Sequence, residues 1–319
     1  MARMAGRGSY IPMSTQFEGK SQWIWTSGSY DQDRASVIFF RKELVLEEDV
    51  KSAVFKISAD SRYRLYINGV SAAQGPCKGD RHVWYYDEVD LSRELRRGIN
   101  VFAIVVLRYP PEHDEGNHSV WRTEMPGLYL DGTILLQNEH RLSFGADKTW
   151  KCFYADHIHL GKHNPYFEPL QITEHVKGDA RSFGWKREDF SDREWDNAFA
   201  YPEFGVKKAI SPGGLSPRPI PFMFEKPRKF DSVVCARTPG TDVKEWEKLI
   251  GEGQALTIPA GTKAIVEISA GAETTGFLET AFAGGEGARL SILCSEAYVY
   301  PKDGHEAFNP GFTKGDPTD

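Results

Sequence analysis

Aromatic side chains with polar neighbours are the residues of this sequence best suited to chemistry. Trp84 and Tyr85 closely follow Arg81, and Trp121 lies in a long polar loop. A pyranose ring can lie with its apolar face on an aromatic side chain while planar polar groups bind its hydroxyls. We therefore predict that Arg81, Trp84, Tyr85 and Trp121 contact a carbohydrate. The alternative is packing in a core, because strand alternation would bury either Tyr85 alone or Trp84 together with Tyr86.

Histidines close to an aspartate form the densest metal-like group. Asp156, His157, His159 and His163 offer the oxygen and nitrogen ligands that zinc accepts. Histidines in a solvated loop explain the same spacing, so we predict no metal site. No set of Asp and Asn residues has the spacing of a calcium loop. We therefore predict no cofactor, with calcium as the ion that a sugar-binding module of this shape would use.

Motifs for nucleophilic or phosphate chemistry are absent from the sequence, which has no G-x-S-x-G, P-loop or H-E-x-x-H pattern. A glycosidase needs two carboxylates on either side of the scissile bond. Glu273, Glu279 and Glu296 lie in or beside predicted strands, where solvated strand faces explain them equally well. Sequence spacing cannot pair carboxylates across a sheet, so we nominate no catalytic residue.

Residues 58–70 are predicted to form a strand and a hairpin turn at the centre of the fold. Tyr63, Leu65 and Ile67 alternate with polar residues, as in a half-buried strand. Asn68-Gly69 follows at once and favours a type I′ hairpin turn. Further strands are predicted at residues 37–46, 51–59, 101–107 and 128–137. This succession of strands and tight turns predicts an antiparallel sandwich.

Glycine and proline are dense over residues 205–221, which we predict to be the linker between two domains. The first domain is predicted at residues 21–204, after a flexible leader at residues 1–20. The second domain is predicted at residues 222–319. Its predicted strands are at residues 230–237, 262–268, 276–282 and 288–295, with helical spacing at 243–250. The expected fold class is all-β, with two antiparallel β-sandwich domains in tandem.

Composition restricts the class of protein. The chain has 319 residues, 40% of them hydrophobic, and a net charge of −6. It has no long basic face, so we expect no nucleic-acid partner, and no apolar run of the roughly 20 residues that cross a bilayer. No apolar signal segment stands in residues 1–20, which predicts a cytoplasmic protein, with secretion left open. Four widely spaced cysteines predict reduced thiols, with disulfides as the alternative.

Three phrases resemble the N-terminal β-domains of the α-L-rhamnosidase family of glycoside hydrolases. The first includes ADSRYRLYINGV at residues 59–70 and WYYDEVDLS at residues 84–92, the second runs from Trp185 to Ala198, and the third runs from Ile265 to Tyr298. Two departures occur in the third phrase. Ile268-Ser269-Ala270-Gly271 stands where the family has Asp-Phe-Gly, and Cys294 stands where it has Tyr.

The resemblance implies jelly-roll, galactose-binding-like sandwiches and a full-length inverting glycosidase that acts on rhamnose-containing oligosaccharides. It places the catalytic carboxylates in a C-terminal (α/α)₆ barrel beyond this region, so the fragment alone is expected to be inactive. Two alternatives remain open. One is a stand-alone carbohydrate-binding or adhesion protein, and the other is the accessory region of a different glycosidase.

Overall fold

The computed structural model describes residues 21–28, 35–80, 83–109, 125–162, 172–202, 215–237 and 242–294. The chain divides into two compact units, Met1–Phe222 and Met223–Asp319. The first unit ends at Phe222, one residue after the end of the predicted linker at residues 205–221. Helices in the described ranges lack the length and apolar character needed to cross a bilayer.

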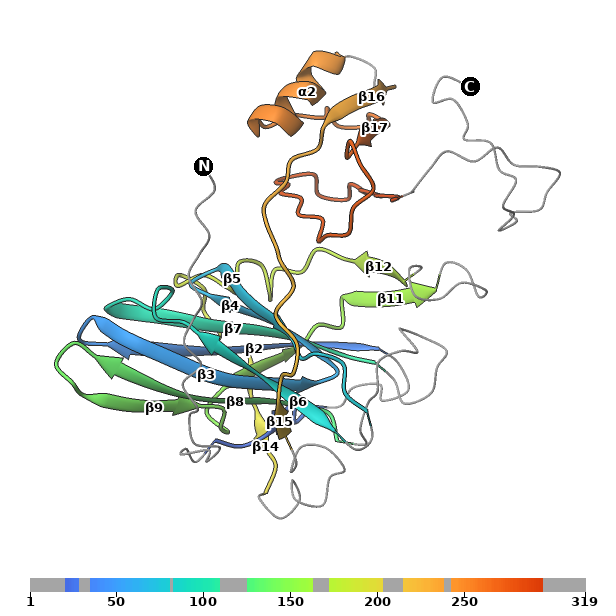
Figure 1. The fold of residues 1–319 in the computed structure, drawn as a ribbon. Coiled ribbons are helices and arrows are strands. Elements are labelled where there is room, and N and C mark those ends of the chain that lie inside the picture. Colours follow the sequence, from blue (N-terminus) through green and yellow to red (C-terminus); the bar gives the residue numbers. More distant parts are fainter. Residues whose placement is uncertain are drawn as a thin grey trace, which may run out of the picture. The chain divides into compact units, whose positions relative to one another are not determined.

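The first unit is a sandwich of two sheets (Figure 1). The seven-stranded sheet has the order β14-β1-β8-β3-β6-β15, with β9 paired to β8, and only β15 is parallel to its neighbour. Its strands are β1 (Ile24–Trp25), β3 (Val50–Asp60), β6 (Trp84–Asp90), β8 (Gly127–Leu136), β9 (Arg141–Gly145), β14 (Phe199–Ala200) and β15 (Leu215–Pro217).

The second sheet of this unit has six antiparallel strands in the order β13-β10-β2-β7-β4-β5. They are β2 (Ser36–Leu46), β4 (Arg62–Ile67), β5 (Val70–Gly75), β7 (Gly98–Arg108), β10 (Lys151–Tyr154) and β13 (Asp196–Asn197). A separate hairpin is formed by β11 (Ile158–Lys162) and β12 (Ile172–Val176). The predicted all-β sandwich is therefore confirmed.

Alternating apolar residues from both sheets form the core between them. Tyr63, Leu65 and Ile67 on β4 are all buried, and Phe55 on β3 faces Phe102 on β7 with ring centroids 5.3 Å apart. After β4, Asn68 and Gly69 have φ values of 51° and 84°, as the predicted type I′ hairpin turn requires. Local alternation and turn chemistry thus set the register of this sheet.

Aromatic residues also cover the outer face of the six-stranded sheet. Trp185 stacks on Phe39 of β2 at 4.5 Å with 4° between the rings, and Trp195 stacks on Phe153 of β10 at 5.2 Å. Arg41 of β2 is 1% exposed, and its Nε donates to the main-chain oxygen of Trp185 at 3.2 Å. The phrase from Trp185 to Ala198 is therefore fixed to the sheet by stacking and by a buried guanidinium.

The second unit, in its described residues, consists of β16 (Ser232–Ala236), α2 (Val243–Glu252) and β17 (Val266–Ser269). The two strands pair antiparallel. The helix confirms the predicted helical spacing, and it begins with a capping box formed by Asp242 and Glu245.

Strands predicted at residues 276–282 and 288–295 were wrong for the described part, where residues 276–294 carry no strand. A period-two pattern forms a strand only when a partner supplies ladder hydrogen bonds, and β16 and β17 pair with each other. Phe282 and Leu293 are 77% and 85% exposed. A second sandwich stays a prediction.

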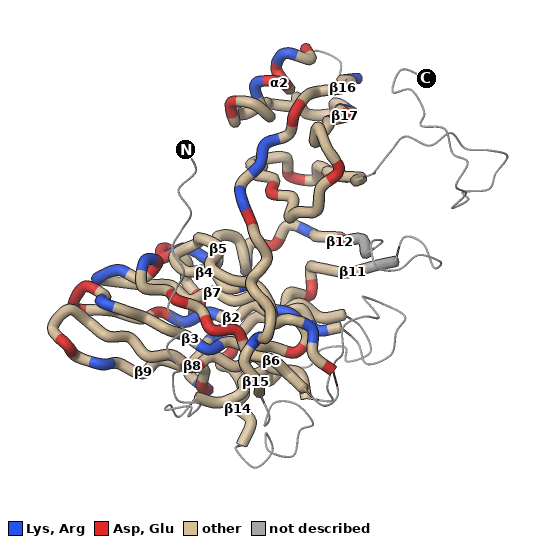
Figure 2. Tube along the Cα trace, in the orientation of Figure 1, with Lys and Arg blue, Asp and Glu red and all other residues tan. Residues whose placement is uncertain are grey.

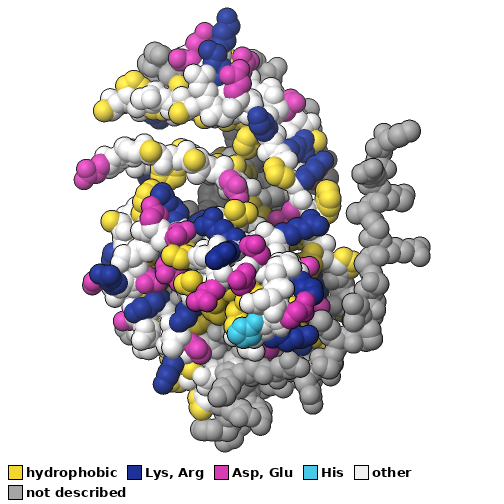
Figure 3. All heavy atoms as spheres, turned by 90° about the vertical axis from the view of Figure 1, so that its left-hand side faces the viewer, with side chains coloured by type: hydrophobic (Ala, Val, Ile, Leu, Met, Phe, Trp, Pro, Cys, Tyr) yellow, Lys and Arg dark blue, Asp and Glu magenta, His cyan; other side chains and the backbone are white. Residues whose placement is uncertain are grey.

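Charged residues of both signs are interspersed along the strands (Figure 2), and basic and acidic side chains are intermingled on the face shown in Figure 3. The structure holds Cys77, Cys152, Cys235 and Cys294 as free thiols, the first two of them buried.

Candidate functional site

The structure describes two of the four predicted carbohydrate contacts, Trp84 and Tyr85. Trp84 begins β6, is 3% exposed and packs against Trp23 and Tyr129, so it has no open ring face for a sugar. Tyr86 is also buried, which matches the core alternative for this strand. Tyr85 lies between them and is half-buried, so its sugar contact stays a prediction. Arg81 and Trp121 lie outside the described residues.

One polar group lies further along β6. Asp87 is 0% exposed, accepts a hydrogen bond at 2.5 Å from the Tyr63 hydroxyl and lies 2.9 Å from Nη1 of Arg218. Burial raises the pKa of Asp87, although both donors act in the opposite direction. Burial, followed by the charge of Asp87, raises the pKa of the Tyr63 hydroxyl well above its usual value. This carboxylate is enclosed and hydrogen-bonded, which suits a structural role.

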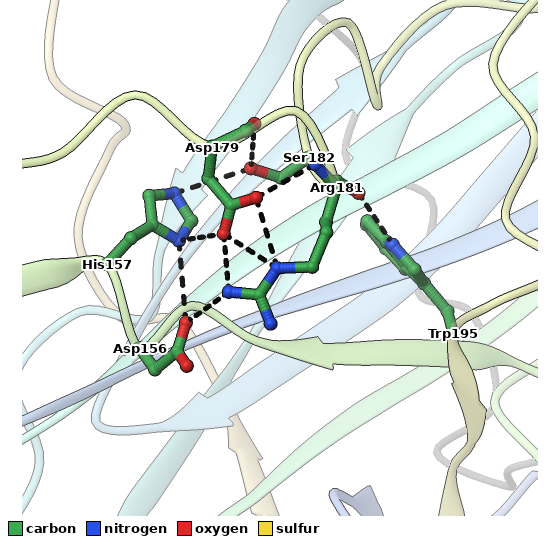
Figure 4. A network of polar contacts seen from close by, with 6 residues as sticks. All are labelled: Asp156, His157, Asp179, Arg181, Ser182 and Trp195. Carbon is green, nitrogen blue, oxygen red and sulfur yellow. Dashed lines mark hydrogen bonds and ion pairs between the residues drawn. The ribbon is translucent and has the colours of Figure 1, made fainter.

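The second polar group, the His157 cluster, lies beside the β11–β12 hairpin (Figure 4). The hairpin brings together the residues before β11 and those after β12, because the main-chain oxygen of His157 accepts a hydrogen bond from the Lys177 amide at 3.0 Å. The members of the cluster are Asp156, His157, Asp179, Arg181, Ser182 and Trp195.

The Arg181 guanidinium lies between the two carboxylates of the cluster. Its Nη2 contacts Oδ1 of Asp156 at 2.7 Å and Oδ2 of Asp179 at 2.5 Å (Figure 4). The hydrogen bond from Arg181 is the main cause that holds the pKa of Asp179 below its ordinary value. The Trp195 indole donates to the main-chain oxygen of Arg181 at 3.0 Å, which joins the cluster to the aromatic layer on the outer face.

Both ring nitrogens of His157 lie close to polar side chains. Its Nδ1 atom lies 3.4 Å from Oδ2 of Asp179 and 4.0 Å from Oδ1 of Asp156, while its Nε2 atom lies 3.3 Å from the Ser182 hydroxyl. Of the histidines in the sequence pattern, His159 is exposed on β11 and His163 lies outside the described residues. Sequence reasoning missed Asp179, because only the hairpin register brings it to His157.

Ser182, His157 and Asp179 contact one another in the sequence hydroxyl, imidazole, carboxylate that an acyl-transfer triad uses. The burial of Ser182, however, does not suit a nucleophile. Ser182 is 7% exposed, and its hydroxyl also donates to the main-chain oxygen of Asp179 at 3.4 Å. A nucleophilic hydroxyl must reach a substrate carbonyl and give its proton to the base. The arrangement therefore serves to orient His157, and the structure gives no reason to nominate a catalytic serine.

The candidate carboxylates for glycoside hydrolysis do not form a pair either. Glu273 and Glu279 are exposed, and Glu296 lies outside the described residues. The two carboxylates that are fully buried in the described part, Asp60 and Asp87, are paired with Arg108 and Arg218, each at 2.9 Å. These pairs hold strands together.

Comparison with known proteins relates the chain to part of a family of glycosidases, although no family model matches it. An α-L-rhamnosidase of Streptomyces avermitilis is 23% identical over 189 residues, which are 58% of this chain and 15% of that protein. The GH78 family rhamnosidase of Bacillus sp. GL1 is 25% identical, with a TM-score of 0.53 over 68% of this chain and 22% of that one. A Pleurotus ostreatus lectin is 21% identical, with a TM-score of 0.41 over 64% of this chain and 46% of the lectin.

The resemblance to the α-L-rhamnosidase family is thereby confirmed for a partial region of those proteins. The chain spans less than a quarter of the length of the two rhamnosidases, 15% of one and 22% of the other.

Proposed function

We propose that this chain is the N-terminal, non-catalytic β-sandwich region of an α-L-rhamnosidase-like glycoside hydrolase that acts on rhamnose-containing glycans. The observation that carries the proposal is the match to the Bacillus sp. GL1 rhamnosidase, with a TM-score of 0.53 over 68% of this chain. The three sequence phrases that resemble the family give the same assignment. The region would position the catalytic domain of the full-length protein or hold a glycan for it.

The chemistry of the described residues supports a non-catalytic role. A glycosidase needs two carboxyl groups about 5–9.5 Å apart across an open substrate site. Asp60 and Asp87 are instead buried against arginines, and Glu273 and Glu279 are exposed. The hydrolytic residues would then belong to a domain outside this chain.

Turnover of an aryl α-L-rhamnoside tests the catalytic half of the proposal. Residues 1–319 alone are expected to release no aryl alcohol, while a protein that continues into a catalytic domain is expected to do so. Release by the fragment at a rate proportional to its concentration, retained through further purification, would overturn the non-catalytic assignment.

Binding of rhamnose-containing oligosaccharides tests the glycan half, measured on a glycan array and then by calorimetry. Tyr85→Ala and Trp121→Ala are expected to weaken binding, since loss of an aromatic platform removes contact with the sugar ring. Phe183→Ala is the matched control, because Phe183 is 78% exposed and is not among the predicted contacts. Selective binding of unrelated glycans would instead favour the stand-alone carbohydrate-binding alternative.

A further inference from the structure

His157 carries a buried ring nitrogen that has no hydrogen-bond partner among the described residues. Its side chain is 10% exposed, and this Nδ1 atom faces Asp179 at 3.4 Å and Asp156 at 4.0 Å. A buried polar atom without a hydrogen bond is costly, so an atom of this kind calls for a physical explanation. The explanation lies in the charge that surrounds it.

The second ring nitrogen of His157 has Ser182 as its neighbour. The Ser182 hydroxyl lies 3.3 Å from Nε2 of His157 and also donates to the main-chain oxygen of Asp179 at 3.4 Å, so its oxygen can accept from an Nε2–H group. In a neutral imidazole with its proton on Nε2, Nδ1 carries a lone pair. That lone pair faces two carboxylates, and a lone pair with two carboxylates attracts a cation.

We propose that His157 Nδ1, Asp179 and Asp156 bind a divalent transition-metal ion of the Zn²⁺ type. The three ligand atoms all lie within 4.8 Å of one another. Zinc bonds to imidazole nitrogen and carboxylate oxygen are about 2.0–2.2 Å long, which separates tetrahedral ligands by about 3.4 Å. The His157–Asp179 separation already has this value, and the exposed Asp156 side chain is free to move closer.

The surroundings of His157 favour zinc over harder cations. Calcium and magnesium prefer oxygen ligands only, whereas imidazole suits zinc and its first-row neighbours. A metal-bound histidine usually donates its second ring N–H to a nearby acceptor, which orients the ring. The Ser182 hydroxyl supplies that acceptor here. Three protein ligands would leave a coordination position for water.

Arg181 is the competitor of the metal ion. Its guanidinium contacts both carboxylates, but its side chain is 59% exposed and can turn toward solvent. The exposed pair with Asp156 contributes little to stability, whereas the contacts of Nε and Nη2 with Asp179, which is 10% exposed, must be replaced by the bonds of the metal ion. Removal of the arginine charge should therefore strengthen metal binding, whereas a site made only for structure would gain nothing from it.

The test is titration of metal-free residues 1–319 with Zn²⁺ by calorimetry against a competing chelator. We expect one site that is lost in His157→Gln and in Asp179→Asn and retained in His159→Gln, the matched control on β11. Ser182→Ala is expected to weaken binding by about tenfold. Arg181→Gln is expected to tighten binding by about tenfold, since it removes a positive charge next to the ion.

Folding and the identity of the ligands are controlled separately. Circular dichroism and thermal melts of each variant show whether it folds, and Arg181→Gln keeps the test decisive if His157→Gln does not. Co²⁺ absorption distinguishes nitrogen and oxygen ligands from thiolates of the partly exposed Cys235 and the exposed Cys294. Failure of Zn²⁺ to bind, equal binding by His157→Gln, loss in His159→Gln alone, or a thiolate spectrum would each overturn the proposal.

Discussion

Arg218 places Nη1 2.9 Å from Oδ1 of Asp87, a carboxylate that is 0% exposed, across a sequence separation of 131 residues. Asp87 lies on β6 of the seven-stranded sheet, and its other oxygen accepts from Tyr63 on β4 of the six-stranded sheet. Arg218 also donates to the main-chain oxygens of Ile220 and Pro221. One buried carboxylate therefore joins both sheets to the segment that follows β15.

Loss of the Arg218 charge should destabilise the first unit strongly. Arg218→Ala leaves the buried carboxylate with the hydrogen bond from the neutral Tyr63 hydroxyl but without its ion-pair partner, and breaking a buried pair in this way costs about 3–5 kcal/mol. Urea unfolding followed by tryptophan fluorescence measures the change. Arg93→Ala, at an exposed arginine, is the control and should stay within about 0.5 kcal/mol of the parent. A similar small effect for Arg218→Ala would show that the pair adds no net stability.

The raised pKa of Asp87 sets a direction for the pH dependence of stability. Burial raises it above 3.8, so the folded state holds this proton more tightly than the unfolded chain does. The contribution of this group to the free energy of unfolding is therefore full below 3.8 and decreases as the pH rises toward the folded-state pKa. Asp87→Asn removes the titration.

The difference in the free energy of unfolding between the parent protein and Asp87→Asn isolates the contribution of the Asp87 titration. Urea unfolding at a series of pH values should show parent stability falling relative to Asp87→Asn across this window and then levelling off. A parent protein that instead gains stability relative to Asp87→Asn with rising pH would mean that Tyr63 and Arg218 outweigh burial and lower the pKa.

Sequence reasoning succeeded where the determinants are local. The alternation of Tyr63, Leu65 and Ile67 and the Asn68-Gly69 turn predict a strand and a hairpin without reference to any other part of the chain. The pairing of β15 with β6 depends on a parallel contact between distant segments, and no local pattern predicts it. Local alternation also predicted strands at residues 276–282 and 288–295, and the described residues of both stretches form no strand.

The polar groups were predicted less well for the same reason. Asp156 and His157 stood out as neighbours in the sequence, but the Asp179 and Arg181 side chains meet them only through the β11–β12 register. The sequence left Trp84 open between a sugar contact and core packing, and the structure buries it against Trp23 and Tyr129 in a cluster separate from the core between the sheets. The spacing of residues in the sequence indicates which side chains share a strand face. The pairing of distant strands decides which side chains lie next to one another.

Removal of the Trp185 side chain tests whether residues 185–198 stabilise the fold by packing on the six-stranded sheet. Trp185 is 6% exposed and stacks on Phe39 at 4.5 Å, so Trp185→Ala should cost about 3–5 kcal/mol in the free energy of unfolding. Phe183→Ala, at a residue 78% exposed, should change it by about 0.5 kcal/mol or less. A double-mutant cycle with Phe39→Ala should give a coupling of about 0.5–1.5 kcal/mol, and zero coupling would exclude direct stacking as the cause.

Thiol reactivity should divide the cysteines by burial. Cys152 is 1% exposed, and burial is the main cause that raises its pKa to about 11, so roughly one thiol in a thousand is ionised at pH 8. Cys294 is exposed, and the thiolate is the reactive form. With an aromatic disulfide reagent at that pH, we expect a fast phase that disappears in Cys294→Ser and a phase from Cys152 that appears only in denaturant. Fast labelling of Cys152 in the folded protein, located by peptide mass, would mean that β10 opens to solvent and would contradict the burial of Cys152 in the core between the sheets.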